Sequence, residues 1–261
     1  MDKLTGSSQF SKLLGAARYS FFYQPLDDAA ASSHCADVVV SSASTIKLFV
    51  MAEVFRQAKE GRLQLSDRVA IPADCMVDFS MVKLLDGANS YTLLDLVKLM
   101  IVQSDNTATN FLIDRVGMES VNLLVAKLGL NATKLQRKML DFEAKAAGYD
   151  NLTSANDLGS FLRMLCNGKV VDSYYDGLMV DVMKHQLDRS MVYAYIPDDV
   201  VVAHKTGDLD GCNHDAGIAF TSNGSFVFAV MVWDADSNNQ SRSIAAKLIA
   251  EMYACQMLRT V

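Results

Sequence analysis

The order of β-rich and helical segments constrains the fold of this 261-residue chain more than any other feature. Runs with the composition of strands occur near residues 19–24 and 36–41, and again at 200–205, 217–221 and 226–233. Between the two sets, roughly 150 residues show mainly the i, i+3, i+4 spacing of helices. The strands at the two chain ends should therefore pair with each other. This predicts an α+β fold, in which an antiparallel sheet built from both chain ends is flanked by terminal helices and carries an all-helical insertion.

The apolar pattern also predicts where the helices lie. Outside the insertion, helices are expected near residues 7–17 and 240–257; inside it, they are expected from residue 44 to Gly61 and near 93–103, 108–116, 120–128, 155–166 and 173–185. We expect a discontinuous α/β sheet domain of residues 1–42 and 195–261, and an all-helical domain of residues 43–194. Residues 131–152 fit no regular element, and long loops of this kind are often functional.

Charge and composition exclude several classes of protein. The chain has 24 Lys and Arg against 30 Asp and Glu, a net charge of −6, and no basic cluster, so a nucleic-acid partner is not expected. No apolar run reaches the roughly 18 residues of a membrane span. The first residues do not resemble a secretory signal, which leaves the compartment open between the cytoplasm and export with a removed leader. Cys and His spacings do not match a metal site.

A serine and a lysine lie three residues apart where the first long helix is expected to begin. Ser44 suits a helix start, and Lys47 would lie on the same helix face, where its amine can approach the Ser44 hydroxyl. A serine hydroxyl becomes a good nucleophile when a neighbouring base takes its proton, and a desolvated lysine can be that base. The same spacing recurs at Ser80 and Lys83, so the pair alone carries little weight.

Two further motifs support a catalytic role for Ser44 and Lys47. Ser104-Asp105-Asn106 follows a predicted helix, and Lys205-Thr206-Gly207 ends a β-branched run. Ser104 lies 60 residues after Ser44 and 101 residues before Lys205, an order and spacing that select Ser44 rather than Ser80. The three motifs together are the signature of class A β-lactamases and penicillin-binding proteins.

With these motifs, and with Ala43, residues 107–110, His204 and residues 215–219, the chain resembles the class A serine β-lactamases along almost its whole length. The resemblance implies a β-lactamase/transpeptidase-like fold with its active site between the helical part and the sheet, and no cofactor or metal. The implied partner is a small molecule, either a β-lactam or a peptidoglycan-like acyl-D-Ala substrate. The oligomeric state stays open.

The resemblance also implies roles for the catalytic residues. Ser44 would attack the substrate carbonyl and form an acyl-enzyme, and Lys47 would help to deprotonate it. Ser104 would relay a proton to the leaving nitrogen. Asn106 would hold Lys47 and the substrate amide.

The third motif is expected to bind the substrate. Lys205 and Thr206 would orient Ser104 and bind the substrate carboxylate, an anion for which a cation is the natural partner. Gly207 and Asp208 would line the same site. The backbone N–H groups of Ser44 and Asp208 would form the oxyanion hole.

The chain departs from the usual family pattern at three places. Met139 occupies the position of the glutamate that activates the deacylating water, and a thioether cannot accept a proton. Asp141 and Glu143 lie nearby and are the candidate replacements. Arg189 is the nearest arginine before the site strand, although a surface or interdomain contact is the simpler expectation for it. Asp208 adds negative charge where a small residue is common.

Several readings remain open on the sequence alone. The first is a β-lactam hydrolase, with slow deacylation because the loop glutamate is missing. The second is a penicillin-binding D-Ala-D-Ala peptidase that β-lactams trap. The third is an esterase that uses the same serine and lysine. A non-enzymatic binding protein is disfavoured, because all three motifs are intact.

Overall fold

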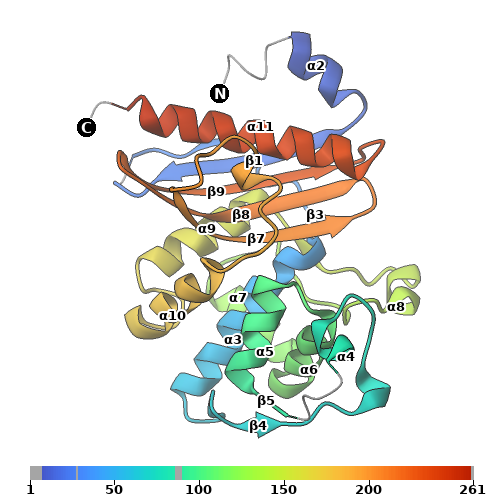
Figure 1. Ribbon diagram of the computed structural model, residues 1–261. Coiled ribbons are helices and arrows are strands. Elements are labelled where there is room, and N and C mark those ends of the chain that lie inside the picture. The colour runs from blue at the N-terminus through green and yellow to red at the C-terminus, as the bar shows by residue number, and fades with distance from the viewer. Residues whose placement is uncertain (1–7, 28, 86–89, 260–261) are drawn as a thin grey trace.

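A five-stranded antiparallel sheet forms one half of the molecule (Figure 1). The computed structural model describes residues 8–27, 29–85 and 90–259, so residue 7, the expected start of the first helix, lies outside the described residues. The strand order is β2-β1-β9-β8-β7. The strands are β1 (Arg18–Pro25), β2 (Ser32–His34), β7 (Val201–Leu209), β8 (Cys212–Thr221) and β9 (Gly224–Trp233). Because β1 pairs along its whole length with β9, both chain ends build the sheet, which confirms the predicted α+β fold.

Helix α11 (Asn238–Met257) covers the outer face of the sheet, and α2 (Ser8–Leu14) packs against α11 (Figure 1). Ser237 caps α11 by accepting a hydrogen bond from the backbone N–H of Gln240. One face of α11 is buried and packs on side chains of β9. The buried residues of this face are Ile244, Ala245, Leu248, Ile249 and Met252.

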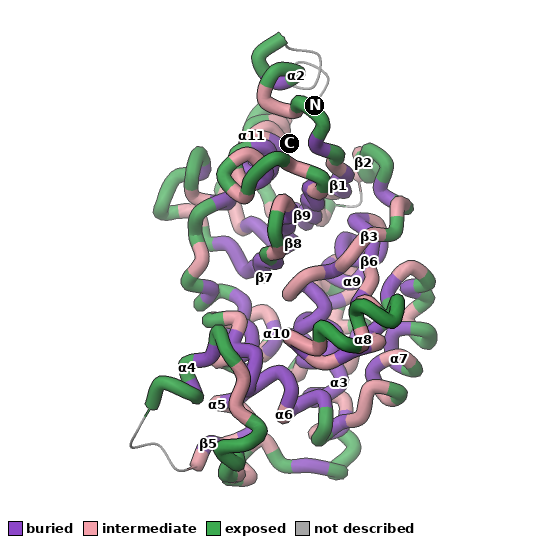
Figure 2. The backbone as a smooth tube through the Cα atoms, turned by 90° about the vertical axis from the view of Figure 1, so that its right-hand side faces the viewer, coloured by how far each residue is buried: buried purple, intermediate pink, exposed green. Residues whose placement is uncertain are grey.

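Helices pack on the inner face of the sheet and extend below it. They are α3 (Lys47–Lys59), α5 (Leu93–Val102), α6 (Asn106–Val116), α7 (Met118–Lys127), α9 (Ala155–Cys166) and α10 (Ser173–Met183). Helix α9 lies directly on the sheet, so close that a Cβ on Gly159 would reach 2.1 Å from the ring of Phe22. Helix α3 is buried on nearly all sides and runs through the centre of this group of helices (Figure 2). No helix in the described ranges combines the length and apolarity needed to cross a bilayer.

Short elements connect the two parts. They are the 3₁₀ turns η1 (Ala43–Ile46), η2 (Ala73–Cys75) and η3 (Val192–Ala194), the helices α4 (Met81–Leu84) and α8 (Phe142–Ala146), and two small antiparallel pairs, β3 (Val40–Ser41) with β6 (Leu152–Thr153) and β4 (Arg68–Val69) with β5 (Tyr91–Thr92). Turn η1 packs against β7 and β8, which brings the start of α3 to the edge of the sheet.

The strand predicted at residues 36–41 is mostly wrong. The chain turns there, with Cys35 at φ +46°, and only Val40 and Ser41 pair with β6. Strand β2 lies just before this turn and was not predicted. A run of small and β-branched residues suits a strand locally, but the turn decides which of them reach a partner.

Candidate active site

Ser44 lies inside turn η1, at the junction between the sheet and α3. The residue that precedes the turn is Ser42, whose backbone N–H donates to the carbonyl of Asn151 at 2.8 Å and whose carbonyl accepts from Thr45. Ser44 is therefore not the helix-capping residue that its position in the sequence suggested. Ala43, directly before it, has φ +45°, a conformation that L-residues rarely adopt.

Lys47 is fully buried at the start of α3. Its Nζ donates to the Ser104 carbonyl at 2.6 Å, to Ser104 Oγ at 3.0 Å and to Asn106 Oδ1 at 2.9 Å. Burial, and then the positive charge of Lys205, lowers the pKa of Lys47 well below its usual value. A lysine in this environment loses its proton more readily than an exposed one, and its neutral form can act as a base.

Ser104 lies between two buried lysines. Lys205 in β7 donates to Ser104 Oγ at 3.1 Å, opposite the bond from Lys47, and to the carbonyl of Thr206 at 2.7 Å. Burial lowers the pKa of Lys205 to about 8, against the opposing effect of Asp208 and other carboxylates. Ser104 has φ +55°, and this strained backbone turns its hydroxyl and its carbonyl toward Lys47.

The second Ser-x-x-Lys sequence has a structural role beside this group. Ser80 Oγ donates to the carboxylate of Asp105 at 3.0 Å and accepts from the backbone N–H of Lys83 at 3.1 Å. Asp105 in turn caps α6 by accepting from the N–H of Ala108 at 2.8 Å. These bonds fix the loop that carries Ser104 and Asn106.

A cavity of about 770 Å³ is lined by residues of the first two motifs and by Asp208, which directly follows the third. Ser44, Ser104, Asn106 and Asp208 line it, together with an apolar wall of Phe79, Met81, Leu84, Met139, Leu140, Phe142 and Leu209. Of the six non-glycine residues with positive φ in the described ranges, four line this cavity, namely Ala43, Phe79, Ser104 and Leu140. Strain of this kind persists only where the surroundings fix it, and it tends to gather at functional sites.

Strand β7 comes very close to Ser44 at Gly207. A Cβ on Gly207 would lie 3.1 Å from the backbone nitrogen of Ser44, 3.1 Å from the Cβ of Ala43 and 3.3 Å from the carbonyl oxygen of Ser42. Gly207 therefore permits the approach of β7 to η1 that brings the backbone of Asp208 to the same cavity as Ser44.

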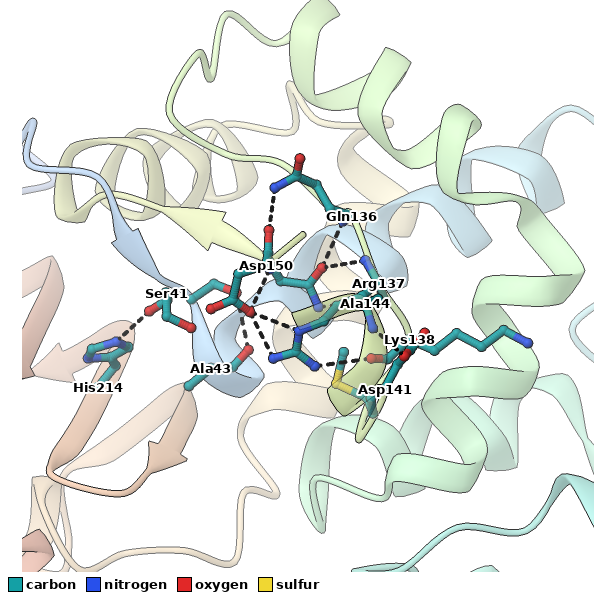
Figure 3. Close-up of polar contacts among 12 residues, drawn as sticks. Ser41, Ala43, Gln136, Arg137, Lys138, Asp141, Ala144, Asp150 and His214 are labelled. Carbon is teal, nitrogen blue, oxygen red and sulfur yellow. Dashed lines mark hydrogen bonds and ion pairs between the residues drawn. The ribbon is translucent and has the colours of Figure 1, made fainter. Parts of the chain in front are cut away.

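The loop of residues 131–152 is fixed by polar contacts (Figure 3). Asn151 Oδ1 accepts from the backbone N–H groups of Gln136 and Arg137, and the Arg137 guanidinium donates to Asp150 at 2.8 and 2.9 Å. On the cavity side, both backbone groups of Met139 bond to the side chain of Asn110, at 2.7 and 3.1 Å. Met139 is nearly buried, and it lines the cavity.

The structure does not bring the two candidate replacement carboxylates to the cavity lining. Asp141 accepts from the N–H of Ala144 at 2.9 Å and so caps α8, as Figure 3 shows. Glu143 is an exposed residue of the same helix. Within the described ranges, no three His, Cys, Asp or Glu side chains are placed to hold a metal ion.

Arg189 makes the kind of contact that the sequence suggested, whereas the partner of Arg242 was not predicted. Arg189 bonds to Asp198 at 3.2 Å and stacks on the ring of Tyr193, which is a surface contact. Arg242, in the first turns of α11, instead reaches Asp208 with a 2.8 Å ion pair. Sequence reasoning missed Arg242, because 34 residues separate it from Asp208 and only the packing of α11 on the sheet joins them.

Comparisons with known proteins agree with this geometry. The family model described as the Beta-lactamase enzyme family matches residues 7–255. A β-lactamase of Rhodobacter capsulatus is 26% identical over 222 residues, which cover 82% of this chain and 75% of that protein. One of Streptomyces fradiae is 28% identical over 222 residues, which cover 80% and 72%.

Solved structures show the same fold. A β-lactamase of Sphaerobacter thermophilus superimposes with a TM-score of 0.87 at 25% identity, over 97% of this chain and 99% of that one. PBP-A superimposes with a TM-score of 0.82 at 25% identity over 97% of both chains, and a mutant of PBP-A has been solved as an acyl-enzyme complex with penicillin G. This chain therefore belongs to the β-lactamase enzyme family and has the fold of its class A members.

Proposed function

We propose that the protein opens the amide bond of β-lactams through an acyl-enzyme on Ser44 and releases the product slowly. The observation that carries this proposal is the position of Ser104 Oγ, within hydrogen-bond distance of both Lys47 and Lys205, in a cavity that Ser44 also lines. The group contains a nucleophile, a base of lowered pKa and a cation that can hold an anionic substrate.

In the acylation step, neutral Lys47 takes the proton of the Ser44 hydroxyl while the oxygen bonds to the lactam carbonyl carbon. The developing oxyanion accepts hydrogen bonds from the backbone N–H groups of Ser44 and Asp208. Ser104 gives its proton to the ring nitrogen as the C–N bond breaks, and receives the proton held by Lys47. The 3.0 Å bond between Lys47 and Ser104 supports this transfer.

Substrate binding follows from the charges around the serine pair. The ammonium of Lys205 and the hydroxyl of Thr206 would receive the substrate carboxylate. Asn106 would hold Lys47 in place through the 2.9 Å bond and keep its amide nitrogen for the substrate.

Slow release follows from Met139. Hydrolysis of the acyl-enzyme needs a base that takes a proton from water as the ester C–O bond breaks, and the thioether of Met139 cannot do so. Asp141 and Glu143 do not line the cavity. The same observation, with the likeness to PBP-A, favours a second candidate function, a D-Ala-D-Ala peptidase that β-lactams trap.

Intact-protein mass spectrometry after mixing with benzylpenicillin tests the acyl-enzyme. The unmodified protein should gain the mass of one benzylpenicillin and keep it for minutes or longer, whereas the Ser44→Ala variant should gain none. Failure of the unmodified protein to gain this mass, or an equal gain in Ser44→Ala, would contradict the proposal. Release of D-alanine from an acyl-D-Ala-D-Ala peptide, beside a persistent penicillin adduct, would favour the peptidase.

Met139→Glu tests the reason for slow release. Because Asn110 fixes the backbone of Met139 and its side chain lines the cavity, a carboxylate there should activate water and shorten the lifetime of the adduct by about tenfold or more. Met139→Gln is the matched control, with similar size and no base, and should leave the lifetime long. Glu143→Gln should leave it unchanged. Equal lifetimes in the Met139→Glu and Met139→Gln variants would show that another step limits release.

A further inference from the structure

The residue that follows the Lys205-Thr206-Gly207 motif brings a carboxylate of the protein itself to the edge of the cavity. Asp208 Oδ1 accepts a hydrogen bond from Arg242 Nη2 at 2.8 Å and another from Asn213 Nδ2. Both side chains of the ion pair are only partly exposed, 36% for Asp208 and 38% for Arg242. At this exposure water screens the pair, so it adds little to stability, but it fixes the position of the Asp208 carboxylate.

Arg242 does not line the cavity itself but forms the 2.8 Å ion pair with Asp208, and the cation Lys145 lines the cavity. Asp210 also lines the cavity, one residue beyond Leu209. On the opposite side, the guanidinium of Arg137 is already bound to Asp150. A substrate carboxylate that approaches Lys205 therefore meets a fixed carboxylate, and the nearest arginine is already paired with it.

We propose that Asp208 is a specificity-determining residue, an internal carboxylate that competes with the carboxylate of the substrate for Arg242. This inference rests on the proposed function. Since Asp208 is tethered beside Arg242, it occupies the arginine at a high effective concentration, and its charge repels a second anion at short range. The site then discriminates against acyl donors with a carboxylate at this position, in favour of donors that are neutral there. A built-in repulsive group is a common source of specificity.

Asp208→Asn tests the proposal with minimal change in shape. The amide keeps an oxygen that can accept from Arg242 and Asn213, but it loses the charge. Two acyl donors are compared at pH 6.5, benzylpenicillin, which carries a carboxylate, and p-nitrophenyl acetate, which does not. Asp208 raises the pKa of Lys205, so removing its charge lowers that pKa; pH 6.5 is chosen because it lies below the value of about 8 in the unmodified protein.

The second-order rate constant of Ser44 acylation by benzylpenicillin should rise about tenfold in Asp208→Asn. This is the change expected when a repulsion between two charges equivalent to about one pKa unit is removed. The ratio of the benzylpenicillin rate to the p-nitrophenyl acetate rate should rise by a similar factor, since only benzylpenicillin carries an anion to repel. Asp210→Asn is the matched control: it removes a charge from the same end of the cavity without touching Arg242, and the benzylpenicillin rate should rise much less. The double variant Asp208→Asn/Arg242→Gln should lose most of the gain.

The outcomes separate the two proposals. If Asp208→Asn and the unmodified protein react with benzylpenicillin at the same rate, the role of Asp208 is wrong while the proposed function stands. The same holds if the variant reacts faster with both donors by the same factor. A full gain that persists without Arg242 would also overturn the competition. If neither form gains mass on Ser44, the proposed function fails and this inference fails with it.

Discussion

Lys47 and Lys205 share one hydroxyl, and this sets the protonation states that the site can use. Each donates to Ser104 Oγ, at 3.0 and 3.1 Å, and both are fully buried. Burial disfavours both ammonium groups, and the charge of Lys205 further disfavours that of Lys47. The three bonds that Lys47 donates are those of an ammonium, and burial and the charge of Lys205 favour the loss of one of these protons. This loss gives a neutral base beside a charged Lys205 that binds the anion, with two titrations that belong to the pair.

The rate of Ser44 acylation by benzylpenicillin should therefore have a bell-shaped dependence on pH. It should rise with pH as Lys47 loses its proton, and fall above about pH 8 as Lys205 becomes neutral and releases the substrate carboxylate. Stopped-flow or quenched mass spectrometry between pH 5 and pH 10 measures this profile. With p-nitrophenyl acetate, which needs no cation, the high-pH fall should be much weaker. A β-lactam profile that keeps rising to pH 10 would contradict the role of Lys205.

Local spacing singled out the residues that meet around Ser104, although it placed Lys205 near the end of a strand, whereas β7 continues to Leu209. It did not predict the partners that arrive from elsewhere in the chain. Arg242 meets Asp208 only through the packing of α11, and Asn110 fixes Met139 across 29 residues. Conversely, Glu143 is close to Met139 in sequence but lies on the exposed surface of α8, so closeness in sequence was a poor guide there.

At the scale of elements, the site depends on how closely β7 approaches η1. Turn η1 has a strained entry at Ala43 and is held to the loop of residues 131–152 by the bond from Ser42 to Asn151. On the other side, Gly207 leaves room for the backbone of Ser44, which a Cβ at this position would crowd at 3.1 Å. The position of Ser44 is thus set by two elements, η1 and β7, that lie far apart in the sequence. This separation fits a helical insertion between the strands of the sheet.

Gly207→Ala should lower the acylation rate more than it lowers stability. The new Cβ would lie 3.1 Å from Ser44 N and from Ala43 Cβ, so η1 must shift by a few tenths of an ångström, and small misplacements at a reacting group reduce rates by about ten- to a hundredfold. The burst rate with benzylpenicillin and the thermal midpoint measure the two effects. Gly177→Ala in α10, with no atom within 4 Å of its Cβ, is the control and should change neither by much. An unchanged burst rate in Gly207→Ala would show that η1 tolerates the displacement.

Long elements were predictable and short ones were not, for a physical reason. Helices such as α5, α9 and α11 and strand β9 have enough residues for a periodic pattern, and their predicted ranges agree closely with the structure. The predicted ranges covered only the first part of β7 and the last part of β8. Elements such as β3, α4 and α8 contain two to five residues and owe their shape to single contacts, for instance the cap that Asp141 provides. A local sequence pattern does not show which residues will make such contacts.

At the scale of the whole molecule, buried polar groups join the sheet to the turn that carries Ser44. His214 in β8 is buried, donates from Nε2 to the carbonyl of Ser41 at 2.9 Å, and accepts at Nδ1 from the N–H of Val232 at 3.3 Å. Figure 3 shows the contact with Ser41. Since one ring nitrogen accepts, this arrangement requires the neutral imidazole. Burial also lowers the pKa of His214, which links the folded state to the neutral form.

The stability of the protein should therefore fall in mild acid, partly through His214. Its pKa is near 6.5 in the unfolded chain and lower in the folded one, so below pH 6.5 the unfolded state binds a proton that the folded state resists. This contribution is fully present above pH 6.5 and is lost at up to ~1.4 kcal/mol per pH unit as the pH falls toward the folded pKa. Urea unfolding at pH 7.5 and pH 5.5 measures it. His214→Gln should be less stable than the unmodified protein at pH 7.5, yet its loss between the two pH values should be smaller by about 1 kcal/mol. Other titrating groups are common to both proteins and cancel in this difference, so equal losses would mean that His214 does not link the sheet and η1 in the way the hydrogen bonds imply.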